Sequence, residues 1–498
     1  MAAEHLDVLI VGAGLSGIGA AHHLQERCPG KSYAILESRA DLGGTWDLFR
    51  YPGIRSDSDM HTLGYNFRPW TNPKSIADGP SILEYVRDTA RDGGIDARIR
   101  FNHKVTAAAW SSEEARWTVT ATRTDSGETA TVTCDFLFMC SGYYRYDQGY
   151  TPEFPGIENF GGQVIHPQHW PEDLDYAGKR VVVIGSGATA MTLVPAMAKD
   201  AAKVTMLQRS PTYVISLPGE DMIANGLRRW LPDRAAYTIT RWKNVTLQGI
   251  SYRLSRKRPQ LMRKLLRRGV VKALPPGYDV DKHFNPSYNP WDQRLCMVPD
   301  SDLFRAISNG SAEVATDTIK GFDAGGVELD SGDRLDADIV ITATGLNVLF
   351  LGGIEVTLDG ERPEMARTMV YKAMMLAEFP NFAFTLGYTN ASWTLKADLV
   401  AEYVCRLINH MDAGGYDVCT PRVNDSSVTE EPLLDFTSGY VLRALEGLPK
   451  QGSKEPWKLR QSYPFDLRSM RFGPVEDGTM QFSRRVAAPQ PVAVTTSG

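Results

Sequence analysis

Two short glycine-rich turns constrain this chain more than any other feature. The first, Gly-Ala-Gly-Leu-Ser-Gly, fills residues 12–17 and follows an apolar, strand-like run at 6–11. The second, Gly-Ser-Gly-Ala-Thr-Ala, fills residues 185–190 and follows a similar run at 180–184. Glycines at these positions allow backbone N–H groups and a helix N-terminus to approach a pyrophosphate closely. We therefore predict two dinucleotide-binding units.

The charged residue that follows each turn differs in sign. Glu37 lies 25 residues after the first glycine of its turn, and Arg209 lies 24 residues after the first glycine of the second turn. A carboxylate at this distance accepts hydrogen bonds from a ribose 2′-hydroxyl, whereas a guanidinium neutralises a 2′-phosphate. The pair predicts FAD in the first unit and NADPH in the second. The alternatives are an ordinary carboxylate at a strand end and a solvated arginine.

The order of apolar and helical segments predicts an α/β fold with two Rossmann-like dinucleotide-binding domains, the second inserted in the first. We expect the FAD-binding domain at residues 1–145 and 335–486, and the NADP-binding domain at 146–334. Strands after about residue 335, beginning at 338–342, are expected to complete the first sheet. The second domain includes a helical insertion at about 220–290, and the small and polar residues 487–498 are expected to form a disordered tail.

Composition excludes several other classes of protein. A net charge of −5 argues against a general nucleic-acid binder. The six cysteines include no C-x-x-C pair, so neither a metal site nor a redox-active dithiol is predicted. The longest early uncharged run, residues 8–21, is too short to span a bilayer, and no secretory signal precedes the first strand. We expect a cytoplasmic protein.

Two further motifs lie between the glycine-rich turns. One runs from Gly43-Gly44-Thr45-Trp46 through Tyr51-Pro52-Gly53 to Asp57. The other is F-x-G-x-x-x-H-x-x-x-W-P, whose fixed positions are filled by Phe160, Gly162, His166, Trp170 and Pro171. Both resemble motifs of the type I Baeyer–Villiger monooxygenases, and the resemblance extends over nearly the whole chain. Residues 288–294 and 390–396 look most like the mycobacterial branch of that family that activates ethionamide.

The resemblance implies an enzyme that uses FAD, NADPH and O2. In this family reduced flavin and dioxygen form a C4a-peroxyflavin, which inserts oxygen beside a carbonyl carbon and turns a ketone into an ester or lactone. Because the flavin supplies the reacting oxygen, the protein needs a dry cavity and a fixed cation rather than a serine or cysteine nucleophile. A ketone or a sulfide is the expected substrate, with sulfoxidation as a side activity, and the oligomeric state stays open.

The predicted cofactor contacts combine the two turns with positions assigned by resemblance. For FAD they are Gly12, Gly14, Ser16, Gly17, Glu37, Gly44, Thr45, Trp46, Asp47, Leu48, Asp57 and Val105. For NADP they are Arg55, Ser56, Gly185, Ser186, Gly187, Ala188, Thr189, Ala190, Arg209 and Ser210. For Trp46 the alternative is a core aromatic. A helix that begins near Ser392 and carries Lys396 is expected to direct its positive end at the flavin.

Arg294 and Asp57 are the predicted catalytic residues. Arg294 matches the active-site arginine of the family, and a guanidinium keeps its charge when partly buried. Asp57 is expected to hold it in place. The alternative for Arg294 is a structural salt bridge. Family members often have a lysine immediately before this arginine, associated with the NADPH phosphate, where this chain has Gln293. Preference for NADPH is therefore expected to depend mainly on Arg209 and Ser210.

His166 invites assignment as a general base because histidine titrates near neutrality. Its motif lies between the two predicted domains, however, so we favour a hinge in which the histidine and tryptophan hold a linker. In the resembled family, rotation of one domain moves NADPH relative to the flavin. His169 lies outside the fixed pattern of the motif and is expected to have no role.

The basic, leucine-containing segment at 254–268 has two interpretations. Its pattern of cations and leucines is amphipathic, which fits contact with an anionic membrane surface. It also fits a solvated face of the helical insertion, which we favour.

Three other functions are considered. A flavin monooxygenase acting mainly on sulfur or nitrogen is the nearest, and the filled hinge motif with Arg294 favours carbonyl chemistry. A flavin disulfide reductase needs a cysteine pair beside the flavin, and residues 43–46 contain none. A non-catalytic NADP(H) sensor is opposed by the presence of Arg294 and Asp57.

Overall fold

The computed structural model describes residues 4–293, 295–434 and 438–485. Each glycine-rich turn connects a buried strand to a helix, as predicted. Strand β1 (Glu4–Val11) leads into α1 (Leu15–Arg27), and β9 (Arg180–Ile184) leads into α5 (Ala188–Met197). Gly12 and Gly185 open the turns with φ of +103° and +127°, a conformation that residues with a Cβ rarely adopt.

The first sheet has the strand order β19-β4-β5-β6-β1-β2-β3, and β22 pairs with β6. Strands β1, β2 (Tyr33–Leu36) and β6 (Thr129–Met139) run parallel at its centre. An antiparallel extension passes through β5 (Arg116–Arg123) to β4 (His103–Ser111). The remaining strands are β3 (Ile99–Arg100), β19 (Glu355–Leu358) and β22 (Phe382–Phe384). The C-terminal α11 (Trp393–Gly414) packs beside α1 over this sheet.

The second sheet is wholly parallel, in the order β13-β10-β9-β17-β8. Its strands are β13 (Ala312–Thr316), β10 (Lys203–Gln208), β9, β17 (Ile339–Thr342) and β8 (Gln163–Ile165). The membership of β17 corrects the sequence analysis, which assigned residues after about 335 to the first sheet. Because β17 pairs with β8 and β9, the chain returns to the first unit only after residue 342.

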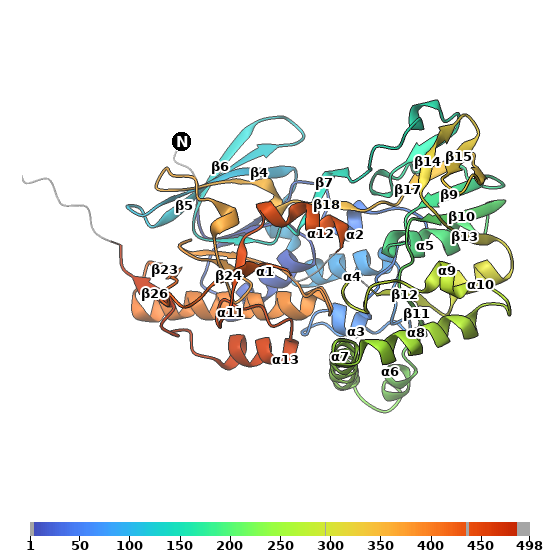
Figure 1. Cartoon of the computed structure of the whole chain (residues 1–498). Helices are drawn as coiled ribbons and strands as arrows, with labels where there is room; N and C mark the ends of the chain where they lie inside the picture. The colour runs from blue at the N-terminus through green and yellow to red at the C-terminus, as the bar shows by residue number, and fades with distance from the viewer. Residues whose placement is uncertain (1–3, 294, 435–437, 486–498) are drawn as a thin grey trace, which may run out of the picture.

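The second unit is inserted in the first, and the two crossing segments lie together. Strand β7 (Tyr144–Gly149) carries the chain out of the first unit, and β18 (Leu346–Val348) carries it back. The two pair in an antiparallel ribbon between the units (Figure 1). The units are therefore joined by one paired connection.

The predicted helical insertion consists of α6 (Met222–Leu227), α7 (Asp233–Lys257), α8 (Pro259–Ala273) and α9 (Val280–Phe284). In Figure 1 helices α6, α7 and α8 lie along the lower edge of the molecule. Helix α7 packs against the short α3 (Met60–Leu63) of the first unit. The insertion thus contacts both units.

Candidate active site

A cavity of about 900 Å³ lies where the two units meet. One end is formed by the first glycine-rich turn and the ends of the strands of the first sheet, and the other reaches the start of α5 in the second unit. Thirteen of the predicted contact residues line it: Gly12, Gly14, Ser16, Glu37, Gly44, Thr45, Trp46, Arg55, Ser56, Asp57, Val105, Ala188 and Thr189. The sequence therefore identified much of the wall.

The first turn forms an open cradle for an anion. Helix α1 has Gly14 as its N-cap, without a side-chain capping bond, so its first backbone N–H groups are available to a ligand. Gly17 does not line the cavity. A Cβ on Gly17 would lie 1.8 Å from the carbonyl oxygen of Gly12, so this glycine allows α1 to approach the turn.

Glu37 lies at the end of β2 with its carboxylate inside the protein. Oε2 accepts a hydrogen bond from the backbone N–H of Ala13 (2.7 Å), and Oε1 accepts one from that of Arg39 (2.9 Å). Burial raises the pKa of Glu37, and the two backbone hydrogen bonds oppose that rise. The carboxylate is thus held against the first turn, on the wall of the cavity.

Two of the predicted flavin contacts turn away from the cavity. Residues 45–48 form the single helical turn α2, in which neighbouring side chains differ in direction by about 100°. Thr45 and Trp46 face the cavity. The buried carboxylate of Asp47 instead pairs with Arg39 (Nε–Oδ2 3.1 Å) and Arg50 (3.0 Å). Leu48 packs on the hydrophobic core of the second unit. Asp47 and Leu48 therefore support the wall from behind.

Residues 51–57 bring the first unit against the second. Gly53 packs so closely on α5 that a Cβ would lie 2.6 Å from the Cβ of Ala196. Arg55 forms an ion pair with Asp302 of the second unit (2.5 Å) and lines the cavity. Burial raises the pKa of Tyr51 to about 12, although a hydrogen bond with Thr189 opposes the rise. This segment, which ends at Asp57, therefore forms the part of the site where the two units are in contact.

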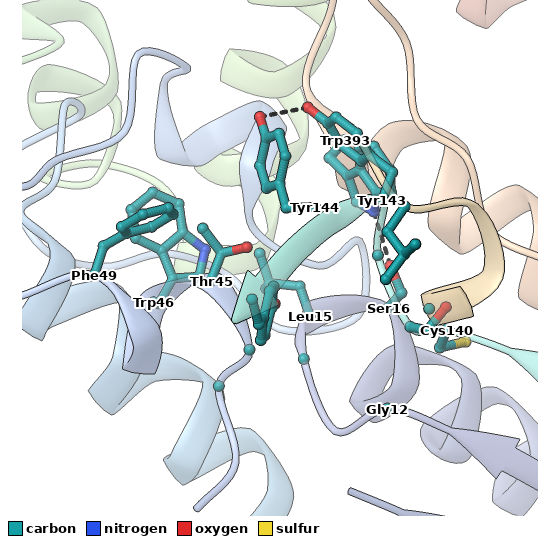
Figure 2. Close-up of a pocket in the computed structure, with 18 of the residues that line it drawn as sticks. Gly12, Leu15, Ser16, Thr45, Trp46, Phe49, Cys140, Tyr143, Tyr144 and Trp393 are labelled. Atoms are coloured by element: carbon teal, nitrogen blue, oxygen red, sulfur yellow. Dashed lines mark hydrogen bonds between the residues drawn. The ribbon is translucent and has the colours of Figure 1, made fainter. Parts of the chain in front are cut away.

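Aromatic side chains form much of the remaining wall, and apart from Trp46 the sequence analysis did not assign them to the site. Figure 2 shows Trp46 and Phe49 on one side of the cavity and Tyr143, Tyr144 and Trp393 on the other. The tyrosine hydroxyls lie 2.6 Å apart, and the ring of Tyr143 stacks on Trp393 (centroids 5.1 Å apart). The indole Nε1 of Trp393 donates to Ser16 Oγ (2.8 Å), which links the start of α11 to the first turn.

Aliphatic residues complete the same wall, and they come from distant parts of the chain. They are Leu63, Met297, Leu346, Leu349, Leu351 and Ile354. The only signal in the sequence was position: Tyr143 and Tyr144 come four and five residues after the last residue of β6, Met139, and ligands of such sheets bind at this edge.

The positive ends of three helices of ten or more residues meet this cavity. Helices α1, α5 and α11 each begin without a side-chain capping bond, at Gly14, Gly187 and Ser392. Leu15, Ala188 and Trp393, the first residues of these helices, line the cavity. The expected helix start at Ser392 is therefore present. Lys396 points elsewhere, since its ammonium donates to Asp466 (2.9 Å) in a separate small pocket.

The second glycine-rich turn lies largely at the surface. Gly187 is exposed and Gly185 and Ser186 are half-buried, and Ser186 Oγ lies 2.8 Å from Thr212 Oγ1. Ala190 is buried in α5, whereas Arg209 and Ser210 are exposed after the end of β10. Among the described residues, Arg209 forms no ion pair. A guanidinium at the end of the neighbouring strand suits a ribose phosphate held at this turn.

The hinge motif holds both crossing segments. His166 Nε2 donates to the carbonyl oxygen of Gly345 (3.2 Å), directly before β18. Gln168 Nε2 donates to the carbonyl oxygens of Arg145 (2.8 Å) and Tyr146 (2.7 Å) in β7. Burial lowers the pKa of His166, which favours the neutral ring.

The other fixed residues of the motif surround this contact. Phe160 packs in the core of the second unit, and Trp170 packs beside the same unit. A Cβ on Gly162 would lie 2.3 Å from the carbonyl oxygen of Asp338. Pro171 and His169 are exposed. Of these residues, His166 has the most direct contact with a linker.

Arg294, the predicted catalytic cation, lies outside the described residues. Its neighbour Gln293 is half-buried, and Met297, three residues further along, lines the cavity. Asp57 lines the cavity as predicted.

The described residues show three further features. No group of His, Cys, Asp and Glu among them could hold a metal ion. All six cysteines are buried, and none of them forms a disulfide within the described residues. No helix in the described part of the chain has the length and apolarity needed to cross a membrane.

Comparison with known proteins identifies the family. The chain is 60% identical over 492 residues to the FAD-containing monooxygenase EthA of Mycobacterium tuberculosis. The matched region covers 99% of this chain and 100% of that protein. The chain belongs to the FAD-containing monooxygenases. It is also 51% identical to the putative FAD-containing monooxygenase MymA of the same species (96% of this chain, 98% of that protein). With the probable FAD-binding monooxygenase AlmA of Acinetobacter baylyi it shares 48% identity (97% of each chain).

Family and structure comparisons agree with this assignment. Residues 67–231 of this monooxygenase match the flavin-binding monooxygenase-like family, and residues 10–72 match the NAD(P)-binding Rossmann-like domain. The fold is that of a steroid monooxygenase solved with NADP (TM-score 0.77, 22% identity, 96% of this chain and 100% of that one). A cyclohexanone monooxygenase in its open form shares it (TM-score 0.72, 21% identity, 84% and 90%). The predicted Rossmann-like fold, FAD as cofactor and an NAD(P)-binding domain are thereby confirmed.

Proposed function

We propose that this monooxygenase inserts one oxygen atom of O2 beside the carbonyl carbon of a ketone. The reaction consumes ketone, O2, NADPH and a proton, and yields an ester or lactone, NADP⁺ and water. When bound, FAD accepts hydride from NADPH and reacts with dioxygen. The observation that carries the proposal is a cavity lined both by the first glycine-rich turn and by many aromatic and aliphatic side chains, with Asp57 on its wall.

The apolar part of the lining supports this reaction by excluding water. Phe49, Tyr143, Leu346, Met297 and Trp393 line the cavity, and such a wall suits a ketone and strengthens electrostatic interactions inside the site. The tyrosine pair and the indole of Trp393 fix the shape of this wall through hydrogen bonds and stacking.

In the proposal, Arg294 supplies the fixed positive charge that stabilises negative charge on oxygen during the reaction. A guanidinium stays protonated in such a site, so it does not depend on pH for its charge. Asp57, on the cavity wall, orients it. Arg55 and Ser56 contact the nicotinamide end of NADPH, and Glu37 accepts from the FAD ribose. These roles follow the family pattern and the positions of the described residues on the wall.

The proposal is tested by product analysis. The FAD-loaded protein is incubated with NADPH, ¹⁸O2 and a straight-chain methyl ketone such as 2-octanone. We expect an ester that contains one ¹⁸O atom for each NADPH consumed. Hydrogen peroxide as the sole product would contradict oxygen transfer altogether. Methyl phenyl sulfide serves as the second substrate, and sulfoxide without any ester would favour a monooxygenase that acts mainly on sulfur.

The role of Arg294 is tested separately. We expect Arg294→Ala to bind FAD and to be reduced by NADPH, but to form no ester. The matched control is Arg267→Ala, which removes an exposed arginine that pairs with Asp281 on the insertion. Normal ester formation by Arg294→Ala would exclude Arg294 as the required cation.

A further inference from the structure

The helical insertion carries an unusual concentration of positive charge. Residues 222–273 contain fourteen lysine and arginine residues and one acidic residue, Asp233, giving a net charge of +13 in a chain whose total is −5. Eight of these cations are exposed and form no ion pair within the described residues: Arg229, Arg234, Arg253, Lys257, Arg258, Lys264, Arg268 and Lys272. Their charge is therefore available to an external anionic partner.

The same segment concentrates exposed apolar side chains. Of the seventeen large hydrophobic side chains exposed in the described part of the chain, eleven lie in residues 222–273. Trp230, in the loop after α6, is 88% exposed, and Met222 is 75% exposed. Side chains of this kind on one surface mark an interaction site when they gather in a contiguous patch.

Helical periodicity puts cations and apolar groups on the same outward faces. On α7, Ile239, Trp242 and Ile250 recur at helical spacing and are exposed, opposite the buried Tyr237 and Arg241. Figure 1 shows α6, α7 and α8 together at one edge of the molecule, and α7 packs against both of the others. The insertion thus presents a connected surface at the edge of the fold.

Helix α8 shows the combination most clearly. Leu261 and Leu265 are exposed on one stripe with Lys264, Arg268 and Lys272, while Leu266 and Val270 of the same helix are buried. Lysine and arginine beside exposed leucine is the pattern of a helix that lies in a membrane interface.

Although the sequence alone favoured a solvated face here, the exposed apolar side chains lead to another interpretation, and we propose that the face formed by α6, α7 and α8 binds the surface of an anionic lipid bilayer. Lipid phosphates complement its cations, and the shallow hydrocarbon beneath them accepts Trp230 and the leucines of α8. A second copy of the chain would bring the same positive charge to the same face, which opposes self-association. Nucleic acid would satisfy the cations but would offer no apolar layer to the leucines, isoleucines and methionine. The inference does not depend on the proposed ketone oxidation.

Vesicle flotation tests the proposal with the FAD-loaded, full-length protein. The probes are vesicles of phosphatidylcholine with one quarter phosphatidylglycerol, and vesicles of phosphatidylcholine alone, at 0.1 M salt. We expect flotation with the anionic vesicles, little with the neutral ones, and release at 0.5 M salt because the Debye length shortens. Equal flotation with both vesicles, or with neither, would overturn the proposal.

Charge reversal locates the surface. For Lys264→Glu, Arg268→Glu and Lys272→Glu combined, we expect the partition coefficient to fall at least a hundredfold, since each lost cation alone weakens binding about fivefold and each added carboxylate is repelled by the lipid phosphates. The control Lys179→Glu, Lys199→Glu and Lys320→Glu changes net charge equally at exposed lysines of the second unit outside the insertion. Both variants should keep FAD and NADPH oxidation. An equal loss in the control would contradict a localised face.

The apolar part is tested at constant charge. We expect Trp230→Ser to lower the partition coefficient several-fold, and the control Val164→Ser, at another exposed apolar residue, to leave it unchanged. Sedimentation without vesicles tests the competing possibility that a second copy of the chain covers this face. If the wild type self-associates and the Lys264/Arg268/Lys272 variant does not, the face is a subunit interface and the membrane proposal fails.

Discussion

The imidazole of His166 occupies the space that a side chain on Gly149 would need. A Cβ on Gly149 would lie 2.0 Å from Cε1 of His166. Gly149 ends β7, and the same ring donates to Gly345, before β18, so one side chain contacts both connections between the units. This contact explains in physical terms why the hinge motif includes a histidine that the chemistry of the site does not need.

We predict that Gly149→Ala displaces the His166 ring and uncouples the two units. FAD should remain bound, since the first unit is unchanged, while reduction of FAD by NADPH should slow about tenfold because the donor is less well placed. Anaerobic stopped-flow absorbance measures this rate. The control is Gly249→Ala, at a position on α7 where an added Cβ meets nothing within 4 Å. Unchanged reduction in Gly149→Ala would show that the contact has no part in placing NADPH.

Buried histidines make stability depend on pH. Burial lowers the pKa of His166 and of His61 below the ordinary value of 6.5. The unfolded chain then binds more protons than the folded protein, so stability present above pH 6.5 is lost as pH falls through the lowered values. Carboxylates with a lowered pKa, such as that of Asp398, make the stability depend on pH only below about pH 4.

We therefore predict that the melting temperature falls between pH 7 and pH 5.5. Neither ring nitrogen of His61 has a hydrogen-bond partner in the described residues, so His61→Leu removes a titrating group without breaking a bond. Thermal melts of this variant should show a smaller fall over the same interval. The exposed His169 provides the control, and His169→Leu should keep the full pH dependence. An identical pH slope in His61→Leu would remove that residue from the explanation.

Arg241 of α7 holds the C-terminal end of α3. Its Nη1 donates to the carbonyl oxygens of His61 (2.9 Å) and Gly64 (2.8 Å), and the side chain is buried. At the other end of α3, Asn244 Nδ2 donates to the Asp59 carboxylate (2.8 Å). The insertion therefore fixes the short helix that follows the Asp57 segment.

We predict that Arg241→Met lowers the free energy of unfolding by about 3 kcal/mol, because it takes the guanidinium donor from buried carbonyl groups and removes the cation 3.6 Å from the buried Asp398 carboxylate. Urea unfolding measures the change. Arg253→Met, at an exposed position of the same helix, should change it by less than about 0.5 kcal/mol. A similar small effect for Arg241→Met would mean that water replaces its hydrogen bonds at little cost.

Local pattern was enough to predict the two nucleotide units. The strands and helices at β1, α1, β9 and α5 follow from apolar runs interrupted by glycines, and they lie within a few residues of their expected bounds. Whether a side chain within a single helical turn faces the cavity was harder to predict, as Asp47 shows. Its orientation depends on Arg39 and Arg50, which the motif does not encode.

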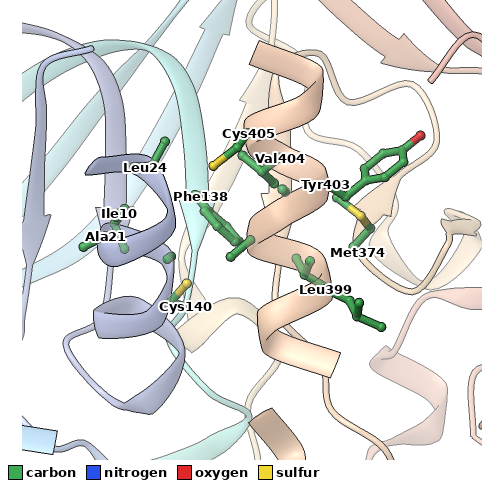
Figure 3. Close-up of a cluster of buried hydrophobic side chains, with 14 of the residues drawn as sticks. Ile10, Ala21, Leu24, Phe138, Cys140, Met374, Leu399, Tyr403, Val404 and Cys405 are labelled. Atoms are coloured by element: carbon green, nitrogen blue, oxygen red, sulfur yellow. The ribbon is translucent and has the colours of Figure 1, made fainter. Parts of the chain in front are cut away.

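Packing between segments far apart in the chain could not be predicted from the sequence. Helices α1 and α11 are separated by more than 350 residues, yet Leu24 and Val404 belong to one core between them (Figure 3). An apolar parallel strand such as β17 fits either sheet, because its pattern does not specify its neighbours. The cavity wall has the same origin, since Met297 of the second unit joins Tyr143 and Trp393 of the first only after the units pack.

Selection of NADPH is the last property that we predict from this structure. Arg209 follows the buried Gln208 at the end of β10 and is exposed, so its removal should leave the fold intact. We expect Arg209→Ala to raise KM for NADPH at least tenfold, the effect of losing one charge-assisted contact, with little change for NADH. Steady-state kinetics with both cofactors measure this, and Lys199→Ala is the exposed control. Conversely, Gln293→Lys should lower KM for NADPH by adding a second cation. Equal effects of Arg209→Ala on both cofactors would assign the arginine to the shared part of the dinucleotide.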